Sequence, residues 1–159
     1  DAFCFADCRS LVTITIPLSV EDIRSFAFSG CTSLINIILH SKITNIGIGA
    51  FQFCTSLKKI ELPPLINEIP NETFAGCVSL EYLVIPDNVR EIRFLAFNGC
   101  SALKKIVMPS SLKCLDKNAF NGCSSLSEIS IPQSFAFDAS SFPPNVKLIK
   151  SENSNCTFF

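Results

Sequence analysis

Residues 27–37 read AFSGCTSLINI, and close variants of this stretch recur along the chain at equal intervals. They read AFQFCTSLKKI from Ala50, TFAGCVSLEYL from Thr73, AFNGCSALKKI from Ala96 and AFNGCSSLSEI from Ala119. Six cysteines mark the period, each 23 residues after the one before: Cys8, Cys31, Cys54, Cys77, Cys100 and Cys123. A fixed period in this range is typical of a solenoid, in which each coil buries its apolar edge against its neighbours.

The positions around each cysteine predict the local structure of one coil. Phenylalanine stands three residues before every one of the six cysteines and leucine three residues after it. An apolar pair two residues apart follows, as in Ile14 and Ile16, which predicts one short strand per coil with one side in the core. Proline after that pair, as at Pro17, ends the strand because it cannot donate to a ladder. The strands should therefore stack as a parallel sheet on a concave face.

The segment with phenylalanine and cysteine is too short for a long helix. We expect one helical turn, 3-10 turn or irregular stretch there, on the convex side. Glycine before the cysteine, as at Gly30 and Gly76, would allow a left-handed exit from that turn. The predicted fold class is thus an α/β solenoid with one parallel strand per 23-residue coil.

The 159 residues suit a single domain, since nearly half are apolar and can form one core. Residues 1–150 are predicted to form one solenoid of six in-register coils and a degenerate capping coil from about residue 133. Its last strand, around Val146 and Leu148, would cover the end of the stack. Residues 151–159 would be a polar tail. The chain begins without Met and within a repeat, which indicates a piece of a longer protein.

Composition argues against several classes of function. The formal charge of −1 gives no field to attract nucleic acid. No apolar run reaches the roughly 18 residues of a membrane span, so we expect no direct membrane insertion in this segment. With a single histidine, His40, no nucleophile, base and orienting group can be assembled, and we expect no enzymatic activity.

The nine cysteines are predicted to be thiols and not disulfides or metal ligands. Six share one position of successive coils, where side chains point in parallel into the core. Cys4 occupies a slot held by alanine elsewhere and is also expected in the core. Cys114 and Cys156 are the expected surface thiols. Because the chain lacks C-x-x-C and has one histidine, we expect neither metal nor cofactor.

The pattern C-x-x-L-x-x-I-x-I-P-x-x-V-x-x-I-x-x-x-A-F-x-x-C resembles the BspA-like, treponemal-type leucine-rich repeat over residues 2 to about 138. Thr73 in place of alanine and His40 in place of proline are among the departures. The resemblance implies a right-handed solenoid that binds proteins, often in surface adhesins that contact host matrix or other cells. It implies no catalytic residue.

The candidate partner-binding residues point outward from the predicted strands, with apolar side chains between charged ones, as in protein-binding patches. They are Asn36, Ile38, Lys59, Glu61, Tyr82, Val84, Lys105 and Val107. The same residues could be no more than residues that favour a sheet surface, which remains the alternative reading.

Two N-glycosylation motifs occur, at Asn71 and Asn155. They favour a surface or secreted adhesion protein that uses the face centred on Tyr82. Reduced cysteines favour the alternative, an intracellular scaffold or cytoskeleton-associated protein built on the same solenoid.

Overall fold

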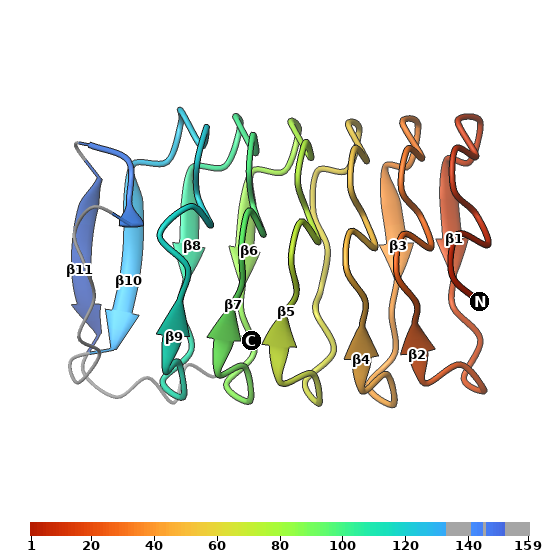
Figure 1. The fold of residues 1–159 in the computed structure, drawn as a ribbon, viewed down its shortest axis with the longest axis horizontal. Helices are drawn as coiled ribbons and strands as arrows, with labels where there is room; N and C mark the ends of the chain where they lie inside the picture. The colour runs from red at the N-terminus through yellow and green to blue at the C-terminus, as the bar shows by residue number, and fades with distance from the viewer. Residues whose placement is uncertain (133–140, 145, 152–159) are drawn as a thin grey trace.

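The computed structural model describes residues 1–132, 141–144 and 146–151, and shows a stack of coils along one axis (Figure 1). We number the coils from the residue before each long strand: coil 1 is 12–34, coil 2 is 35–57, coil 3 is 58–80, coil 4 is 81–103 and coil 5 is 104–126. Coil 6 begins at residue 127, and residues 1–11 form half a coil in front of coil 1. The predicted solenoid is confirmed.

The longer strands lie side by side on one face of the stack, which we call the strand face. They are β1 (Thr13–Thr15), β3 (Asn36–Ile38), β6 (Tyr82–Val84), β8 (Lys105–Val107), β10 (Glu128–Pro132) and β11 (Lys147–Ser151). All their pairings are parallel, and one period separates partners such as Tyr82 and Lys105. β11 pairs with β10 and adds a strand at that end of the sheet. Residues 59–61 of coil 3 occupy the same place but form no strand.

In addition to the predicted parallel strand, the coils have a second strip of pairing. Two-residue strands run along the stack: β2 (Asp22–Ile23), β4 (Asn45–Ile46), β5 (Glu68–Ile69), β7 (Glu91–Ile92) and β9 (Cys114–Leu115). Their isoleucines point into the core, as Ile69 and Ile92 do with 0% and 1% exposure. Such short strands exist because the coil before and the coil after hold them in register, so propensity within one coil does not reveal them.

The phenylalanine-and-cysteine segments, called turn segments below, take the irregular form among those expected and not a helical turn. Their N–H groups alternate between two acceptors. Cys31 N donates to Phe28 O within the segment at 3.2 Å, whereas Phe28 N donates to Ala50 O of the next coil at 2.8 Å. An α-helix would direct every N–H four residues back. Turn segments therefore consist of consecutive turns that form a third hydrogen-bonded strip between coils.

A left-handed residue ends each turn segment, as the glycines predicted. Gly30, Gly76, Gly99 and Gly122 have φ between 72° and 75°. Phe53 occupies the same position in coil 2 with φ of 57°, a conformation that costs a residue with a Cβ about 1–2 kcal/mol. Its ring lies over Gly76 of coil 3, where an added Cβ would come 2.4 Å from Phe53 Cδ1.

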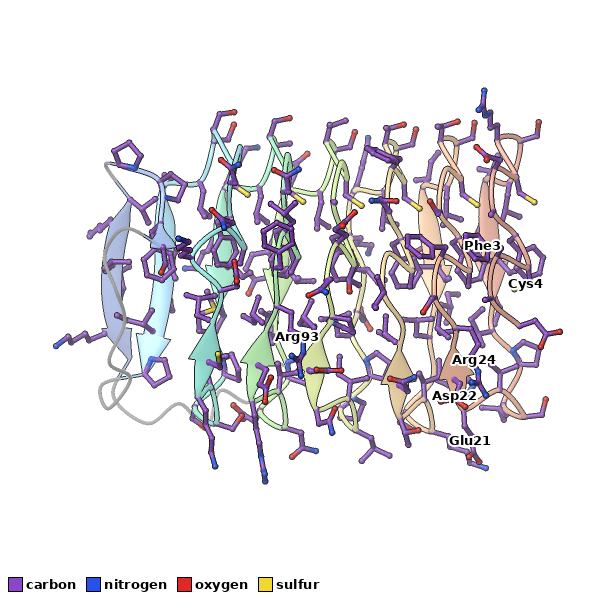
Figure 2. All side chains as sticks on the ribbon, viewed as in Figure 1. Phe3, Cys4, Glu21, Asp22, Arg24 and Arg93 are labelled. Carbon is purple, nitrogen blue, oxygen red and sulfur yellow. The ribbon has the colours of Figure 1, made fainter. Side chains whose placement is uncertain are left out.

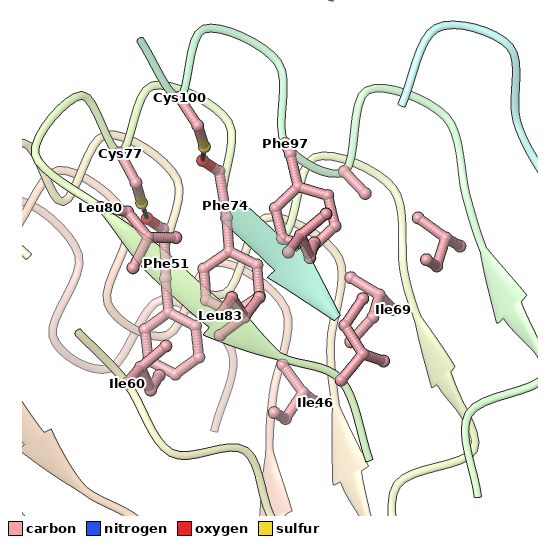
Figure 3. Packing of buried hydrophobic residues seen from close by; sticks show 14 of the residues in the cluster. Ile46, Phe51, Ile60, Ile69, Phe74, Cys77, Leu80, Leu83, Phe97 and Cys100 are labelled. Atoms are coloured by element: carbon pink, nitrogen blue, oxygen red, sulfur yellow. Dashed lines mark hydrogen bonds between the residues drawn. The ribbon is translucent and has the colours of Figure 1, made fainter. Parts of the chain in front are cut away.

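The core is a column of phenylalanine rings, one from each turn segment (Figure 3). From Phe5 to Phe120 the centroids of neighbouring rings lie 5.2–5.8 Å apart and the ring planes differ by 2–11°. Burying each ring stabilises the fold by about 1.5–3 kcal/mol. Every coil thus contributes the same ring to one continuous apolar column.

A second column consists of thiols that donate to the coil before. Cys77 Sγ lies 3.1 Å from Phe51 O and Cys100 Sγ 3.1 Å from Phe74 O (Figure 3). Cys31, Cys54 and Cys123 make the same contact. Burial raises the pKa of the Cys31 thiol to about 11 and that of Cys77 to about 12. These five thiols are buried and free, as predicted.

The prediction of a core position is wrong for Cys8 and Cys4, which are both exposed. Figure 2 shows Cys4 with Phe3 at the N-terminal end of the stack. The reason is geometric, because residues 1–11 have a coil on one side only. Burial at these positions depends on a preceding coil and not on the residue itself.

Candidate protein-binding face

The candidate residues lie on the strand face with their side chains in solvent or partly so. Tyr82 is 43% exposed, Val84 47% and Ile38 51%. Lys59 and Glu61 are also exposed, whereas Asn36, Lys105 and Val107 are partly buried. The alternation is that of a strand, since Leu83 between Tyr82 and Val84 is 1% exposed.

The structure brings four of these eight residues together in one sheet. Tyr82 is in register with Lys105, and Val84 with Val107, so an apolar pair lies beside an aromatic and a cation. Asn36 and Ile38 belong to a separate two-stranded sheet with β1. Lys59 and Glu61 come from residues 59–61, between the two sheets. The face therefore has two halves with coil 3 at the boundary.

Charged pairs surround the apolar half and link neighbouring coils. Lys105 Nζ contacts Glu128 of coil 6, and this hydrogen bond raises the pKa of Lys105. Lys104 Nζ lies 3.0 Å from Glu81 Oε2, and that hydrogen bond lowers the pKa of Glu81. The four side chains are 30–65% exposed, so the pairs contribute more to orientation than to stability.

Sequence reasoning missed three exposed apolar residues that enlarge this surface. Val12 and Ile35, which directly precede β1 and β3, are 50% and 48% exposed. Val78, before Leu80, is 42% exposed. The sequence could have revealed Val12 and Ile35. The residue before the strand is apolar in coils 1 and 2, whereas coils 3, 4 and 5 have a charged residue there, Lys58, Glu81 or Lys104.

A separate group of charges lies on the strip of two-residue strands. Arg93, labelled in Figure 2, contacts Glu68 at 2.5 Å and Glu91 at 2.9 Å. The hydrogen bond to Glu68 raises the pKa of Arg93. One guanidinium thus bridges carboxylates of coils 3 and 4, which are stacked by the register of β5 with β7.

Other residues singled out in the sequence have ordinary surroundings. His40 Nε2 lies 2.8 Å from Pro17 O at a corner of the stack, and Cys114 is exposed, as predicted. Within residues 1–132, 141–144 and 146–151, no three His, Cys, Asp or Glu side chains gather as metal ligands would. The described segments also include no helix with the length and apolarity needed to cross a bilayer.

The glycosylation motif at Asn71 lies in the turn segment of coil 3, and Asn71 is partly exposed. Its threonine, Thr73, is 0% exposed and donates from Oγ1 to Pro70 O at 2.9 Å. Thr73 thus has a structural role in a slot where other coils have alanine. Asn155 and Cys156 lie outside the described residues.

Comparison with known proteins gives consistent matches. The model for the BspA type leucine rich repeat region matches residues 1–104 and 67–157, with 6 copies. A leucine rich cell surface protein from Faecalibacterium prausnitzii is 34% identical over 81% of this chain and 33% of its own length, with a TM-score of 0.72. A leucine rich repeat protein of T. pallidum is 28% identical over 87% of this chain and 69% of its own, with a TM-score of 0.75.

The pneumococcal vaccine antigen PcpA shares the fold, with 24% identity over 88% of this chain and 36% of its own and a TM-score of 0.75. No curated protein matches the chain significantly. This chain spans about a third of the F. prausnitzii protein. The family model covers nearly all of the sequence. The chain therefore belongs to the BspA-type leucine-rich repeat family.

Proposed function

We propose that this chain is a non-catalytic protein-binding module whose partner lies on the strand face, around Tyr82. One observation carries the proposal. Tyr82, Val84 and Ile38 expose 43–51% of their surface on the two sheets of the strand face, and the lysines beside Tyr82 are paired with Glu81 and Glu128. Aromatic and apolar residues within a polar rim are typical of protein interfaces.

The partner that we propose is a protein of the host matrix or of another cell surface. The family and the similarity to a cell surface protein support this choice. Binding to immobilised collagen, laminin and fibrinogen tests it. Tyr82→Ala should weaken binding at least tenfold, since aromatic anchors dominate interface energies.

The matched control is Phe94→Ala, which removes an aromatic of similar exposure, 45%, from the turn segment of the same coil. It should leave binding unchanged. Equal losses in both variants would refute a site on the strand face. An unfolded Tyr82→Ala variant would show that the side chain belongs to the core.

An intracellular scaffold is the second candidate, and one observation favours it. All eight cysteines among the described residues are free, including the exposed Cys4, Cys8 and Cys114, and exposed free thiols persist in reducing compartments. Mass spectrometry of the native protein separates the candidates, because a glycan on Asn71 requires passage through a secretory compartment.

A further inference from the structure

The hydrogen bonds between coils are uneven along the stack. Both strand strips are paired between coils 1 and 2, by β1 with β3 and β2 with β4, and between coils 4 and 5. Between coils 2 and 3 neither strip is paired, and both sheets are interrupted there. The turn segments still join these coils, for example through Phe51 N and Thr73 O at 2.9 Å.

In the strip of two-residue strands, one of the missing bonds has a covalent cause. Gly47, Arg93 and Asp116 each donate an N–H to the isoleucine carbonyl one coil earlier, at 2.7–3.0 Å. The equivalent residue in coil 3 is Pro70, which has no N–H to offer Ile46 O.

On the strand face, two bonds that pair coils 1 and 2 are also missing at the joint between coils 2 and 3. Ile35 N donates to Val12 O, and Ile16 N to Ile38 O, between coils 1 and 2. The equivalent bonds from Lys58 N to Ile35 O and from Leu39 N to Glu61 O are not formed among the described residues. Coil 3 differs from its neighbours by a second proline, Pro64, after Pro63.

A hollow of about 290 Å3 opens at this joint on the strand face. It is lined by residues 36–39 of coil 2 and 59–61 of coil 3. Ile38 and the exposed Lys59 and Glu61 are among them, so the hollow has an apolar wall and one charge of each sign. It lies within the surface that the sequence singled out.

We propose that this hollow is a subsite for an extended polypeptide segment of the protein partner. The segment would place one apolar side chain against Ile38 and its main chain against the unpaired groups of the joint. This proposal rests on the proposed function, because it locates the partner's main chain on the strand face.

The unpaired groups determine the chemistry of the occupant. Lys58 N and Leu39 N are two donors, and Ile35 O and Glu61 O are two acceptors. Main-chain groups withdrawn from water need partners, and a peptide supplies one C=O and one N–H with each residue. An anion would satisfy only the donors and would meet Glu61, whereas a cation would satisfy only the acceptors and would meet Lys59.

The first experiment examines the free protein by NMR-detected hydrogen exchange. The amides of Leu39 and Lys58 should exchange at least a hundredfold faster than those of Ile85 and Lys104, their hydrogen-bonded equivalents. Equal protection at the four amides would show a closed joint and overturn the proposal.

The second experiment uses random 12-residue peptides displayed on phage and selected on the whole chain. The dissociation constants of the enriched peptides, made synthetically, are then measured. We expect an apolar residue in common among them and slower exchange of Leu39 and Lys58 when they bind. Absence of any enriched peptide would overturn the proposal.

Two variants test the location. The double variant Pro64→Ser with Pro70→Ala restores a non-proline residue at both positions and the missing N–H at residue 70. It should close the joint and weaken peptide binding at least tenfold. Ile38→Arg should fill the hollow and weaken binding similarly even if the joint stays open. Thr15→Arg, at the same strand position in coil 1, is the control and should not change binding.

These results separate the subsite from the proposed function. Peptides that lose affinity with Tyr82→Ala but not with Ile38→Arg or the double proline variant would leave the strand face as the binding surface and refute the subsite. Loss with Ile38→Arg and retention with Tyr82→Ala would place the peptide in the hollow and move the centre of the face away from Tyr82.

Discussion

The N-terminal half coil and coil 3 share the repeated phenylalanine and cysteine but place them in different surroundings. Phe5 is 37% exposed and Phe74 is 0% exposed. Cys8 is exposed, whereas Cys77 is buried and donates to Phe51 O. The difference shows that a coil acquires its core from the two coils beside it, so stability should depend on position in the stack more than on residue type.

Phenylalanine truncation should give the largest contrast between these two regions. Phe74→Ala removes a fully buried ring with neighbours on both sides and should cost about 3–5 kcal/mol of unfolding free energy. Phe5→Ala removes a ring stacked on Phe28 alone and should cost less than half as much. Urea denaturation measures both, and similar losses would contradict the dependence on neighbours.

Two glycines give a sharper comparison, because they share a backbone conformation but not a neighbour. Gly99→Ala should cost about 1–2 kcal/mol for its left-handed φ, since only atoms of Gly76 lie near the added Cβ, at 3.9 Å. Gly76→Ala should cost at least about 1 kcal/mol more, because Phe53 must move. Denaturation of Gly76→Ala with Phe53→Gly should show that the excess disappears.

The thiol column should make stability fall at alkaline pH. The pKa of Cys77 is raised to about 12 in the folded protein, from an ordinary value of 9.0. Above about pH 9 the unfolded chain releases this proton while the folded protein still holds it. The contribution of the protonated thiol to the free energy of unfolding is therefore complete below about pH 9 and declines as pH rises toward 12. Urea midpoints at pH 8 and pH 10.5 should differ, with the lower value at pH 10.5.

Removing one member of the column should reduce this pH dependence. Cys77→Ser keeps a donor for Phe51 O but lacks the titrating thiol, so the loss between the two pH values should shrink by about 2 kcal/mol. Cys114→Ser, at an exposed position, is the matched control and should leave the loss unchanged. An equal loss of stability between the two pH values in the original protein and in both variants would show that the thiol column does not cause it.

Much of the fold could be predicted because the repeat reports the core directly. The unbroken spacing of the cysteines fixed the register, and the alternation around Leu83 placed Tyr82 and Val84 outside. The strip of two-residue strands was not predicted, since Glu91 and Ile92 resemble any polar–apolar pair until neighbouring coils align them. Of the forms expected for the turn segments, the structure has the irregular one, because their N–H groups alternate between their own coil and the next.

The outward-pointing residues of the candidate face were predicted, but the interruption of its sheet at coil 3 was not. The outward columns followed from strand periodicity, whereas the missing pairing between coils 2 and 3 was not foreseen from Pro64 and Pro70, of which Pro70 removes one N–H there. Neither proline interrupts the repeat in the sequence. Cys4 and Cys8 were misplaced for a related reason, because a pattern shared by all coils does not show which coils have neighbours on both sides.

The strict stacking of coils has a mechanical consequence. A coil adds only about 4.8 Å to the length of the stack, yet its 23 residues reach roughly 75–80 Å when drawn out. Tension applied to the two ends would therefore detach coils one after another from an end. Each detached coil would add many times more extended chain than the folded length it removes. A tethered molecule under flow would therefore lengthen in steps while the remaining coils stay folded.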